Sequence, residues 1–321
     1  MLTGYSMTVL VTGGAGFIGS HLVDYLIDGG GEVCVIDDLS AGSLGNLRRW
    51  EDDPRLCFVE GDLLDPEAVI GALGGCGAVY HLAANPEVRA SRASPEDHFK
   101  QNVEATYRLL EAVRKMGGVE LFVFTSSSTV YGEADMVPTP EDYGPLKPIS
   151  HYGASKLAAE ALVSAYASMY GFRAVIFRLA NIIGPRSKHG VVYDFVEKLK
   201  ADPGKLEVLG DGSQSKSYLY VDDCVRGMVL GAEEARDRVE VFNLGSDDRV
   251  SVKEIARTVM LEMGLDGCEV RLTGGVDGGR GWAGDVKVMQ LDSSRLRSLG
   301  WRPGLNSVEA VRETARALVR G

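Results

Sequence analysis

The order of the apolar segments constrains this chain more than any other feature of its sequence. Short runs rich in β-branched and aromatic residues, typical of buried strands, alternate with segments that have helical periodicity. We expect strands at residues 8–12, 32–37, 56–62, 78–84, 121–126 and 173–181, and helices at about 16–27, 66–73, 95–116 and 152–170. Such alternation is typical of an α/β fold in which a doubly wound parallel sheet has helices on both faces.

The pattern changes after residue 180, where glycine is frequent and the periodicity is irregular. A chain of 321 residues has room for about two domains of roughly 150 residues each. We predict a dinucleotide-binding domain over residues 1–180 and a smaller substrate-binding lobe over 181–321. A segment near 218–245 is expected to return to the first domain, with the strand at 241–246 joining the main sheet. Helices are expected near 190–200 and after Ser307.

Composition excludes several classes of function. A net charge of −11 opposes a nucleic-acid partner, which requires a basic surface. No apolar run is long enough to span a membrane, and no basic region precedes the first apolar segment, so we expect a cytoplasmic protein. The five cysteines show no CxxC spacing, and neither a disulfide framework nor a metal site is predicted. Cys34 and Cys57 lie in apolar runs and are predicted to be buried thiols.

A glycine-rich turn joins the first strand to the first helix. The segment VTGGAGFIGS (11–20) places Gly13, Gly16 and Gly19 there, together with Phe17 and Ile18. Glycines at this position allow a tight turn and let a pyrophosphate approach the N-terminus of the helix, where free N–H groups favour an anion. The context predicts a dinucleotide site in a Rossmann-type fold.

The residues that end the second strand indicate which dinucleotide binds. Asp37 follows Gly19 by eighteen residues, where a carboxylate accepts hydrogen bonds from the adenosine ribose. Asp37 and Asp38 would repel a 2′-phosphate, and no arginine occurs before Arg48. The sequence therefore favours NAD over NADP.

A tyrosine and a lysine lie four residues apart at the start of a predicted helix, in YGASK. Tyr152 and Lys156 therefore project from the same face. A phenol can act as a base at neutral pH only if its pKa falls by about three units, which requires about 4 kcal/mol of phenolate stabilisation. The lysine ammonium and a positive nicotinamide ring could supply this stabilisation together.

Five hydroxyl side chains, at residues 125–129, stand where the fifth strand ends. Hydroxyls favour turns because they bond their own backbone. The carboxyl ends of strands in open parallel sheets are also where ligands bind. From these residues alone the turn is favoured, and the motifs in the rest of the chain favour a ligand site.

Taken in order, several short motifs resemble the extended short-chain dehydrogenase/reductase family. They are TGGAGFIGS, HLAA, SSSTVYG, YGASK and RLANIIGPR, and they are most similar to nucleotide-sugar epimerases of the UDP-glucose (UDP-galactose) 4-epimerase type. The resemblance implies that Tyr152 is the catalytic base, that Lys156 lowers its pKa, and that Ser127 bonds the reacting sugar oxygen. It also implies cofactor contacts, directly or through support of the site, from Asp62, Leu63, Leu82, Ala83, Ala84 and Asn102.

The resemblance also implies a UDP-sugar site in the second lobe. Asn181 and Lys216 match positions that contact the diphosphate, and HGVVYDF leaves backbone N–H groups around Val191 to do so. Arg280 stands two residues earlier than the usual arginine, with Trp282 in its place. The implied substrate residues are Ser127, Ser128, Asn181, Val191, Lys216, Arg280, Asp285 and Met289, of which Asp285 matches the ribose-binding position and Met289 a position near carbon 2 of the sugar.

The family contains several reactions, which the hydroxyl segment helps to separate. In 4,6-dehydratases the matching stretch reads like TDEVYG, and decarboxylases carry a glutamate before VYG, whereas this chain has Ser128 and Thr129. We expect interconversion of UDP-glucose and UDP-galactose by transient oxidation at carbon 4 with tightly bound NAD. The alternatives are a dehydratase or decarboxylase, a UDP-glucuronate or UDP-N-acetylhexosamine 4-epimerase, and a non-catalytic NAD-binding regulator.

A partner subunit is also expected. The segment from Lys156 to Gly171 carries one charge, Glu160, after the lysine and is otherwise mainly apolar or small. A helix at the surface of a monomer should be polar on its outer side. We therefore predict a homodimer that pairs this helix and the helix beginning near Pro95.

Overall fold

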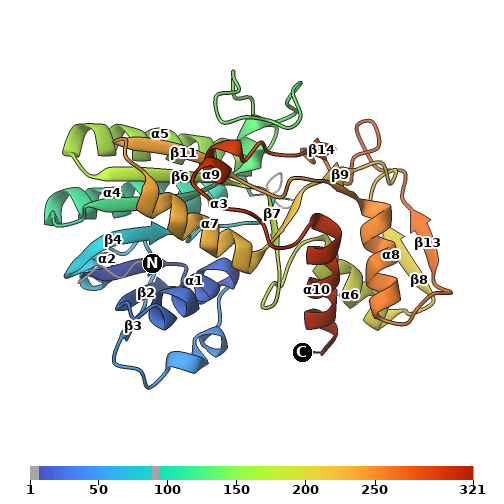
Figure 1. The fold of residues 1–321 in the computed structure, drawn as a ribbon, viewed down its shortest axis with the longest axis horizontal. Helices are drawn as coiled ribbons and strands as arrows, with labels where there is room; N and C mark the ends of the chain where they lie inside the picture. The colour runs from blue at the N-terminus through green and yellow to red at the C-terminus, as the bar shows by residue number, and fades with distance from the viewer. Residues whose placement is uncertain (1–6, 89–93, 321) are drawn as a thin grey trace.

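The computed structural model describes residues 7–88 and 94–320 (Figure 1). Its main sheet contains seven strands that all run parallel. Their order across the sheet is β11 (Val239–Leu244), β6 (Arg173–Leu179), β5 (Leu121–Ser127), β4 (Cys76–His81), β1 (Thr8–Thr12), β2 (Val33–Asp37) and β3 (Leu56–Glu60). The predicted α/β class with a doubly wound parallel sheet is confirmed.

The strand order reverses at β1. From β1 the chain adds β2 and then β3 on one side, and it then crosses to the other side of β1 to form β4, β5 and β6. Loops that follow β1 and β4 therefore leave the sheet in opposite directions. Such a switch point leaves a crevice at the carboxyl edge of a parallel sheet, where ligands bind.

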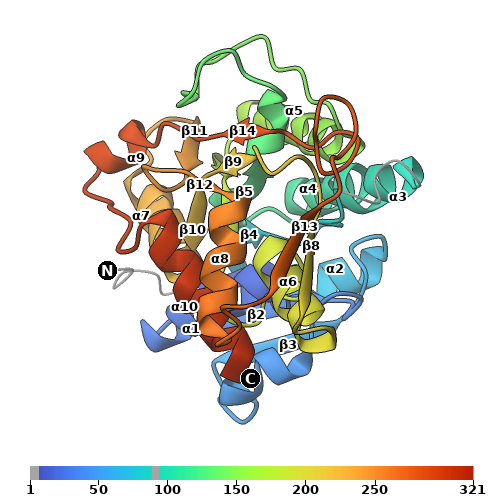
Figure 2. The ribbon, with the colours of Figure 1, turned by 90° about the vertical axis from the view of Figure 1, so that its right-hand side faces the viewer.

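Helices cover both faces of the sheet (Figures 1 and 2). One face packs against α1 (Phe17–Asp28) and α7 (Val221–Glu234), which contribute Leu22 and Met228 to its core. The other face packs against α2 (Pro66–Leu73), α4 (Ala105–Met116) and α5 (His151–Tyr170), with Leu109 and Val163 in the core. Helix α5, which carries Tyr152 and Lys156, thus lies directly on the sheet.

The helix predicted over 95–116 is divided into three parts. A short helix α3 (Pro95–His98) leads into a π-helical segment η4 (Phe99–Glu104), and α4 follows. A π segment changes the direction in which side chains project and is frequent at functional sites. Here it carries Asn102.

Helices α7, α8 (Val252–Glu262) and the short α9 (Ser294–Ser298) were not predicted. In α7, Gly227 and Gly231 face the sheet, where an added Cβ would lie 2.5 Å from Leu244 and 2.8 Å from Phe177. The helix lies so close to the sheet that it requires glycine at these two positions. Apolar side chains there would have shown the helical period in the sequence. Glycine also has low helix propensity, so the segment resembles a loop.

The C-terminal lobe has a core of its own, beside the carboxyl edge of the sheet (Figure 1). Helices α6 (Val191–Ala201), α8 and α10 (Ser307–Arg320) pack against one another, and α6 and α8 also contact β8 (Lys205–Val208), which pairs with β13 (Glu269–Leu272). In the returning segment, β11 joins the main sheet as predicted, whereas β10 (Tyr218–Tyr220) pairs with β7 (Asn181–Ile183) outside it. The domain boundary at residue 180 stays a prediction.

The predicted burial of Cys57 is wrong. Cys34, on β2, is buried, but Cys57 lies on β3, the edge strand of the sheet, and is exposed. An edge strand has a neighbour on one side only, so an apolar run does not ensure burial there.

Among residues 7–88 and 94–320, no helix is both long enough and apolar enough to cross a membrane. The cytoplasmic location stays a prediction.

Candidate active site

A cavity of about 1020 Å³ opens at the carboxyl ends of the strands, and residues of both lobes line it. Its size suits a large ligand. The cavity brings together most of the predicted site residues. They are Gly13, Gly16, Phe17, Ile18, Gly19, Asp37, Asp38, Asp62, Leu63, Leu82, Ala83, Ala84, Ser127, Ser128, Tyr152, Asn181, Val191, Lys216, Asp285 and Met289. Lys156, Asn102 and Arg280 are outside this lining.

The glycine turn after β1 has the shape that a dinucleotide needs. Gly13 adopts a φ of 68°, and a Cβ there would lie 2.8 Å from the backbone nitrogen of Ala83. A Cβ on Gly19 would lie 2.1 Å from the carbonyl oxygen of Gly13. The backbone therefore packs too closely for any side chain, and α1 begins at Phe17 without a side-chain cap. These features fit a pyrophosphate at the helix N-terminus.

Asp37 is held beside this turn. Its carboxylate accepts hydrogen bonds from the backbone N–H groups of Ala15 and Leu39, each at 2.9 Å. Burial raises the pKa of Asp37, and the backbone N–H groups oppose that shift. The neighbouring Asp38 accepts from the backbone N–H and the hydroxyl of Ser40. Two carboxylates at this end of the cavity suit ribose hydroxyls and disfavour a 2′-phosphate.

Asn102 supports the site from behind the cavity. Its Oδ1 accepts a hydrogen bond of 2.7 Å from the backbone N–H of Asn85, in the loop after β4. Its Nδ2 donates to the Ser155 hydroxyl on α5 at 2.9 Å. Asn102 thus connects the loop that borders the cavity to the helix that carries Tyr152 and Lys156.

Tyr152, Lys156 and Ser127 converge at the end of β5. The Ser127 hydroxyl lies near the Tyr152 phenol and favours its charged form. The Lys156 ammonium donates to the carbonyl oxygen of Thr125 at 3.0 Å and lies 6.0 Å from the centre of the Tyr152 ring. The first turn of α5, capped by Ser150, directs these side chains towards the strand end.

The pKa values of Tyr152 and Lys156 differ from those that the sequence argument requires. Burial raises the pKa of Tyr152 to about 12, and the nearby Ser127 hydroxyl opposes the shift. Burial lowers the pKa of Lys156 to about 7, and the Glu160 carboxylate opposes that shift. A low-polarity environment disfavours both charged forms, and the ammonium is not in contact with the phenol. The expected lowering of the tyrosine pKa is therefore not present in the protein alone.

The hydroxyl segment serves both as a turn and as a cavity wall. Ser127 caps the short helix η5 (Ser128–Tyr131), accepting hydrogen bonds from the Thr129 backbone N–H at 3.2 Å and from the Thr129 hydroxyl at 2.9 Å. Ser127, Ser128 and Thr129 also line the cavity. The two interpretations of this segment are compatible.

The charged residues predicted for the second-lobe site, Lys216, Asp285 and Arg280, each take part in an ion pair. Lys216 and Asp285 form an ion pair of 2.5 Å with little exposure. Arg280 pairs with Glu133 and donates to the backbone carbonyl of Asp285 at 2.7 Å. The structure therefore places Arg280 as a connection to the loop after β5 and outside the cavity, while Trp282 lines it. The expected diphosphate contact of Arg280 has no support from this position.

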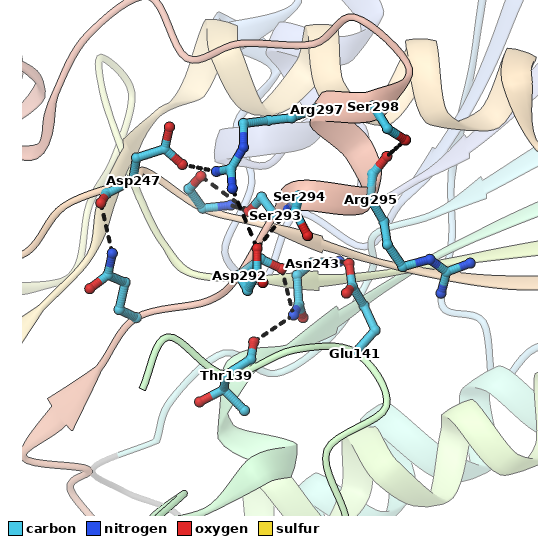
Figure 3. Close-up of polar contacts among 12 residues, drawn as sticks. Thr139, Glu141, Asn243, Asp247, Asp292, Ser293, Ser294, Arg295, Arg297 and Ser298 are labelled. Carbon is cyan, nitrogen blue, oxygen red and sulfur yellow. Dashed lines mark hydrogen bonds and ion pairs between the residues drawn. The ribbon is translucent and has the colours of Figure 1, made fainter. Parts of the chain in front are cut away.

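Met289 lies in β14 (Val288–Met289), and contacts to the first lobe hold the adjoining segment in place. The backbone N–H of Thr139 donates to Gln290 O, and that of Asp292 donates to Thr139 O, both at 2.9 Å. Asn243, at the end of β11, donates through Nδ2 to the carbonyl oxygens of Thr139 and Asp292 (Figure 3). Met289 therefore forms a well-anchored part of the cavity wall.

The polar residues that line the cavity and were not predicted include Gln214, Arg186 and Lys188. Arg186 is paired with Asp24 at 2.8 Å. Gln214, Arg186 and Lys188 lie in irregular segments, where no helical or strand periodicity indicates which side chains face the cavity. Gln214 had one available signal, because it stands two residues before Lys216 and alternate residues of an extended segment share a face.

Comparison with known proteins places these features in one family. The model of the NAD dependent epimerase/dehydratase family matches residues 9–245. The UDP-glucose 4-epimerase of Mycolicibacterium smegmatis is 36% identical over 320 residues, covering 96% of this chain and 97% of the relative. A UDP-galactose 4-epimerase structure is 44% identical with a TM-score of 0.85, covering 98% and 99%. A dTDP-glucose 4,6-dehydratase double mutant from Streptomyces venezuelae, solved with NAD, is 33% identical with a TM-score of 0.88, covering 97% and 96%.

The low pKa of Lys156 predicts a pH-dependent stability. An unfolded lysine titrates near 10.4, so between about pH 7 and pH 10 the unfolded chain binds more protons than the folded one, and stability rises with pH. Urea unfolding of nucleotide-stripped protein should show this rise, and Lys156→Met should flatten it. The exposed lysine variant Lys205→Met is the matched control and should keep the parent slope. Equal slopes in the parent and in Lys156→Met would contradict the burial argument.

Proposed function

The chain belongs to the NAD dependent epimerase/dehydratase family, as its motifs predicted, and we propose that it binds NAD and interconverts UDP-glucose and UDP-galactose by inversion at carbon 4. The family also contains dehydratases and decarboxylases, so the reaction has to be argued from this chain's own site.

The observation that carries the proposal is the chemistry of the strand end beside Tyr152. The residues of β5 and η5 that line the cavity are Thr125, Ser127, Ser128 and Thr129, and all four carry hydroxyls. Elimination of water needs an acid and a base in addition to the tyrosine. Hydroxyls at the positions where related dehydratases carry carboxylates cannot fill those roles at neutral pH. Inversion needs neither group.

The residues of the chain have distinct parts in this reaction. Tyr152 removes the proton from the 4-hydroxyl of the sugar and later returns it, while Ser127, which lies near Tyr152, holds the same oxygen. Lys156, buried beside Thr125, favours the phenolate when it is charged. Bound NAD supplies the chemistry of taking hydrogen from carbon 4 as hydride and returning it to the opposite face.

The second lobe is proposed to hold the UDP group. Helix α6 begins at Val191 with Gly190 at its N-cap and no side-chain cap, so its first backbone N–H groups are suited to a phosphate. Lys216 adds a positive charge to the cavity wall, and its partner Asp285 is proposed to contact the ribose. The relatives named as UDP-sugar epimerases support a uridine nucleotide.

The proposal includes a homodimer formed through α5. Both charged residues of this helix after its first turn, Lys156 and Glu160, are buried. Its exposed face consists largely of small and apolar residues: Ala154, Ala158, Ala161, Ala165, Ser168, Met169 and Tyr170. The Met169 side chain is 73% exposed. A flat apolar face on a surface helix marks an interaction site, and it allows close packing against a second copy.

Incubation with UDP-glucose or UDP-galactose, followed by chromatography of the nucleotide sugars, tests the reaction. Either substrate should give the same mixture of the two. Tyr152→Phe should lower kcat by about 100-fold or more with NAD retained, because it removes the proton acceptor and almost no volume. The surface variant Tyr25→Phe should retain parent activity. A 4-keto-6-deoxy or decarboxylated product, or a Tyr152→Phe rate within tenfold of the parent, would refute the assignment.

The choice of sugar is predicted to depend on Met289. A methionine is flexible, so it closes the pocket less firmly than a tyrosine ring and more than a small residue. UDP-glucose and UDP-galactose should be the preferred pair, with slower turnover of their N-acetyl counterparts. Met289→Tyr should lower kcat/KM for the N-acetyl sugars further, whereas Met136→Tyr, on an exposed loop, should leave the ratio unchanged. An unaltered ratio in Met289→Tyr would show that this residue does not border the sugar.

The dimer is tested by light scattering at micromolar concentration. The parent, with a chain mass of 34.5 kDa, should scatter as two chains. Ala161→Arg, in the middle of the exposed α5 face, should shift it to one chain, because an arginine prevents close approach of a second helix. Ala201→Arg, at the exposed end of α6, is the matched control and should remain dimeric. A monomeric parent would argue against the proposed interface.

A further inference from the structure

Two cysteine side chains lie in contact on neighbouring strands, away from the groups used in the proposed reaction. Cys34 on β2 and Cys57 on β3 are register partners in the parallel ladder. The Cys34 thiol donates a hydrogen bond to the Cys57 sulfur, and the two Sγ atoms are 3.0 Å apart. Their environments differ, because Cys34 is buried and Cys57 is exposed at the edge of the sheet.

We propose that Cys34 and Cys57 form an oxidation site that closes reversibly to a disulfide in the presence of a peroxide. Neighbouring strands lie about 4.8 Å apart, within the Cα separations of about 4.4–6.8 Å that disulfides span. The side chains already point towards each other, so the bond requires a movement of the sulfur atoms of only about 1 Å from contact to bonding distance.

The difference in exposure sets the order of the steps. The Cys57 sulfur, which solvent reaches, attacks a peroxide oxygen; the O–O bond breaks, a sulfenic acid forms and the first water leaves. The Cys34 sulfur then attacks the Cys57 sulfur, the S–O bond breaks, and the hydroxide leaves with the Cys34 proton as the second water. Two thiols are oxidised by two electrons in total, and one hydrogen peroxide is reduced to two waters.

Burial supports this assignment of roles. Burial and the adjacent Cys57 raise the pKa of the Cys34 thiol, so Cys34 is a poor first nucleophile towards a peroxide in solution and acts only on a sulfur placed beside it. Cys76, the other cysteine of this region, is buried, and its thiol donates to the carbonyl oxygen of Ala72 at 3.4 Å. Burial raises the pKa of Cys76 to about 11.

The site lies behind the adenosine end of the cavity. Cys34 precedes Asp37 by three residues on β2, and β3 leads from Cys57 to Asp62, and both aspartates line the cavity. A bond between the cysteines would join the two strands that carry these carboxylates. The inference does not depend on which sugar the enzyme uses.

Thiol counting and peptide mapping test the site on the full chain. After treatment with hydrogen peroxide and removal of the excess, denatured protein should titrate three thiols in place of the five in the sequence, and dithiothreitol should restore five. Cys57 and Cys76 share one tryptic peptide, so a glutamate-specific protease that cuts after Glu60 is needed to separate them. Mass spectrometry of that digest should find the Cys34 peptide joined to the Cys57 peptide.

Cysteine variants distinguish this pair from other thiol chemistry. Cys34→Ser and Cys57→Ser should each abolish the cross-link, whereas Cys76→Ser and Cys224→Ser should keep it, since neither residue is in the pair. Five thiols remaining after peroxide, a Cys57 peptide that gains oxygen without a cross-link in the parent, or a disulfide between two chains on a non-reducing gel would each overturn the proposal.

Discussion

The position of β1 between β2 and β4 organises the whole molecule. All strands of the sheet run parallel, so each delivers its following residues to the same edge. Gly13 follows β1, Asp37 ends β2, Asp62 follows β3, Ala83 follows β4 and Ser127 ends β5. Because the chain reverses its order of strand addition at β1, the loops diverge and leave a cavity there. Groups distant in sequence are thus brought together by the direction of the strands.

The helix that carries Tyr152 is held by polar groups in an apolar layer. Glu160, one turn after Lys156, forms a buried ion pair of 2.8 Å with Arg178 on β6. Arg178 also donates to the Tyr131 hydroxyl, which donates to Asn243 on β11. A buried charge needs its partners, because removing one leaves the other without compensation. The network therefore defines one position for α5 relative to the sheet and the η5 turn.

The two ends of the cavity are built differently. The dinucleotide end consists of strand ends and a tight glycine turn, whose geometry follows from the regular elements around it. The end that we propose for the sugar consists of irregular segments from the second lobe, held by contacts across the chain such as Arg280 with Glu133 and Asn243 with Asp292. A family that shares one fold can change its substrate in the second part while keeping the first, because loops vary more readily than packed strands.

The sequence by itself determined the features that depend on neighbours along the chain. The alternation of strands and helices predicted the parallel sheet, the glycine turn and Asp37 predicted the dinucleotide end, and a spacing of four placed Tyr152 and Lys156 on one helix face. The tertiary structure decided what depends on distant neighbours. Helix α7 was not predicted because its glycines pack against the sheet. Cys57 is exposed because β3 is an edge strand. Arg280 is paired with Glu133, which lies 147 residues away in the sequence. Burial, which shifts the pKa values of Tyr152 and Lys156, is a property of the packed chain and has no local signature in the sequence.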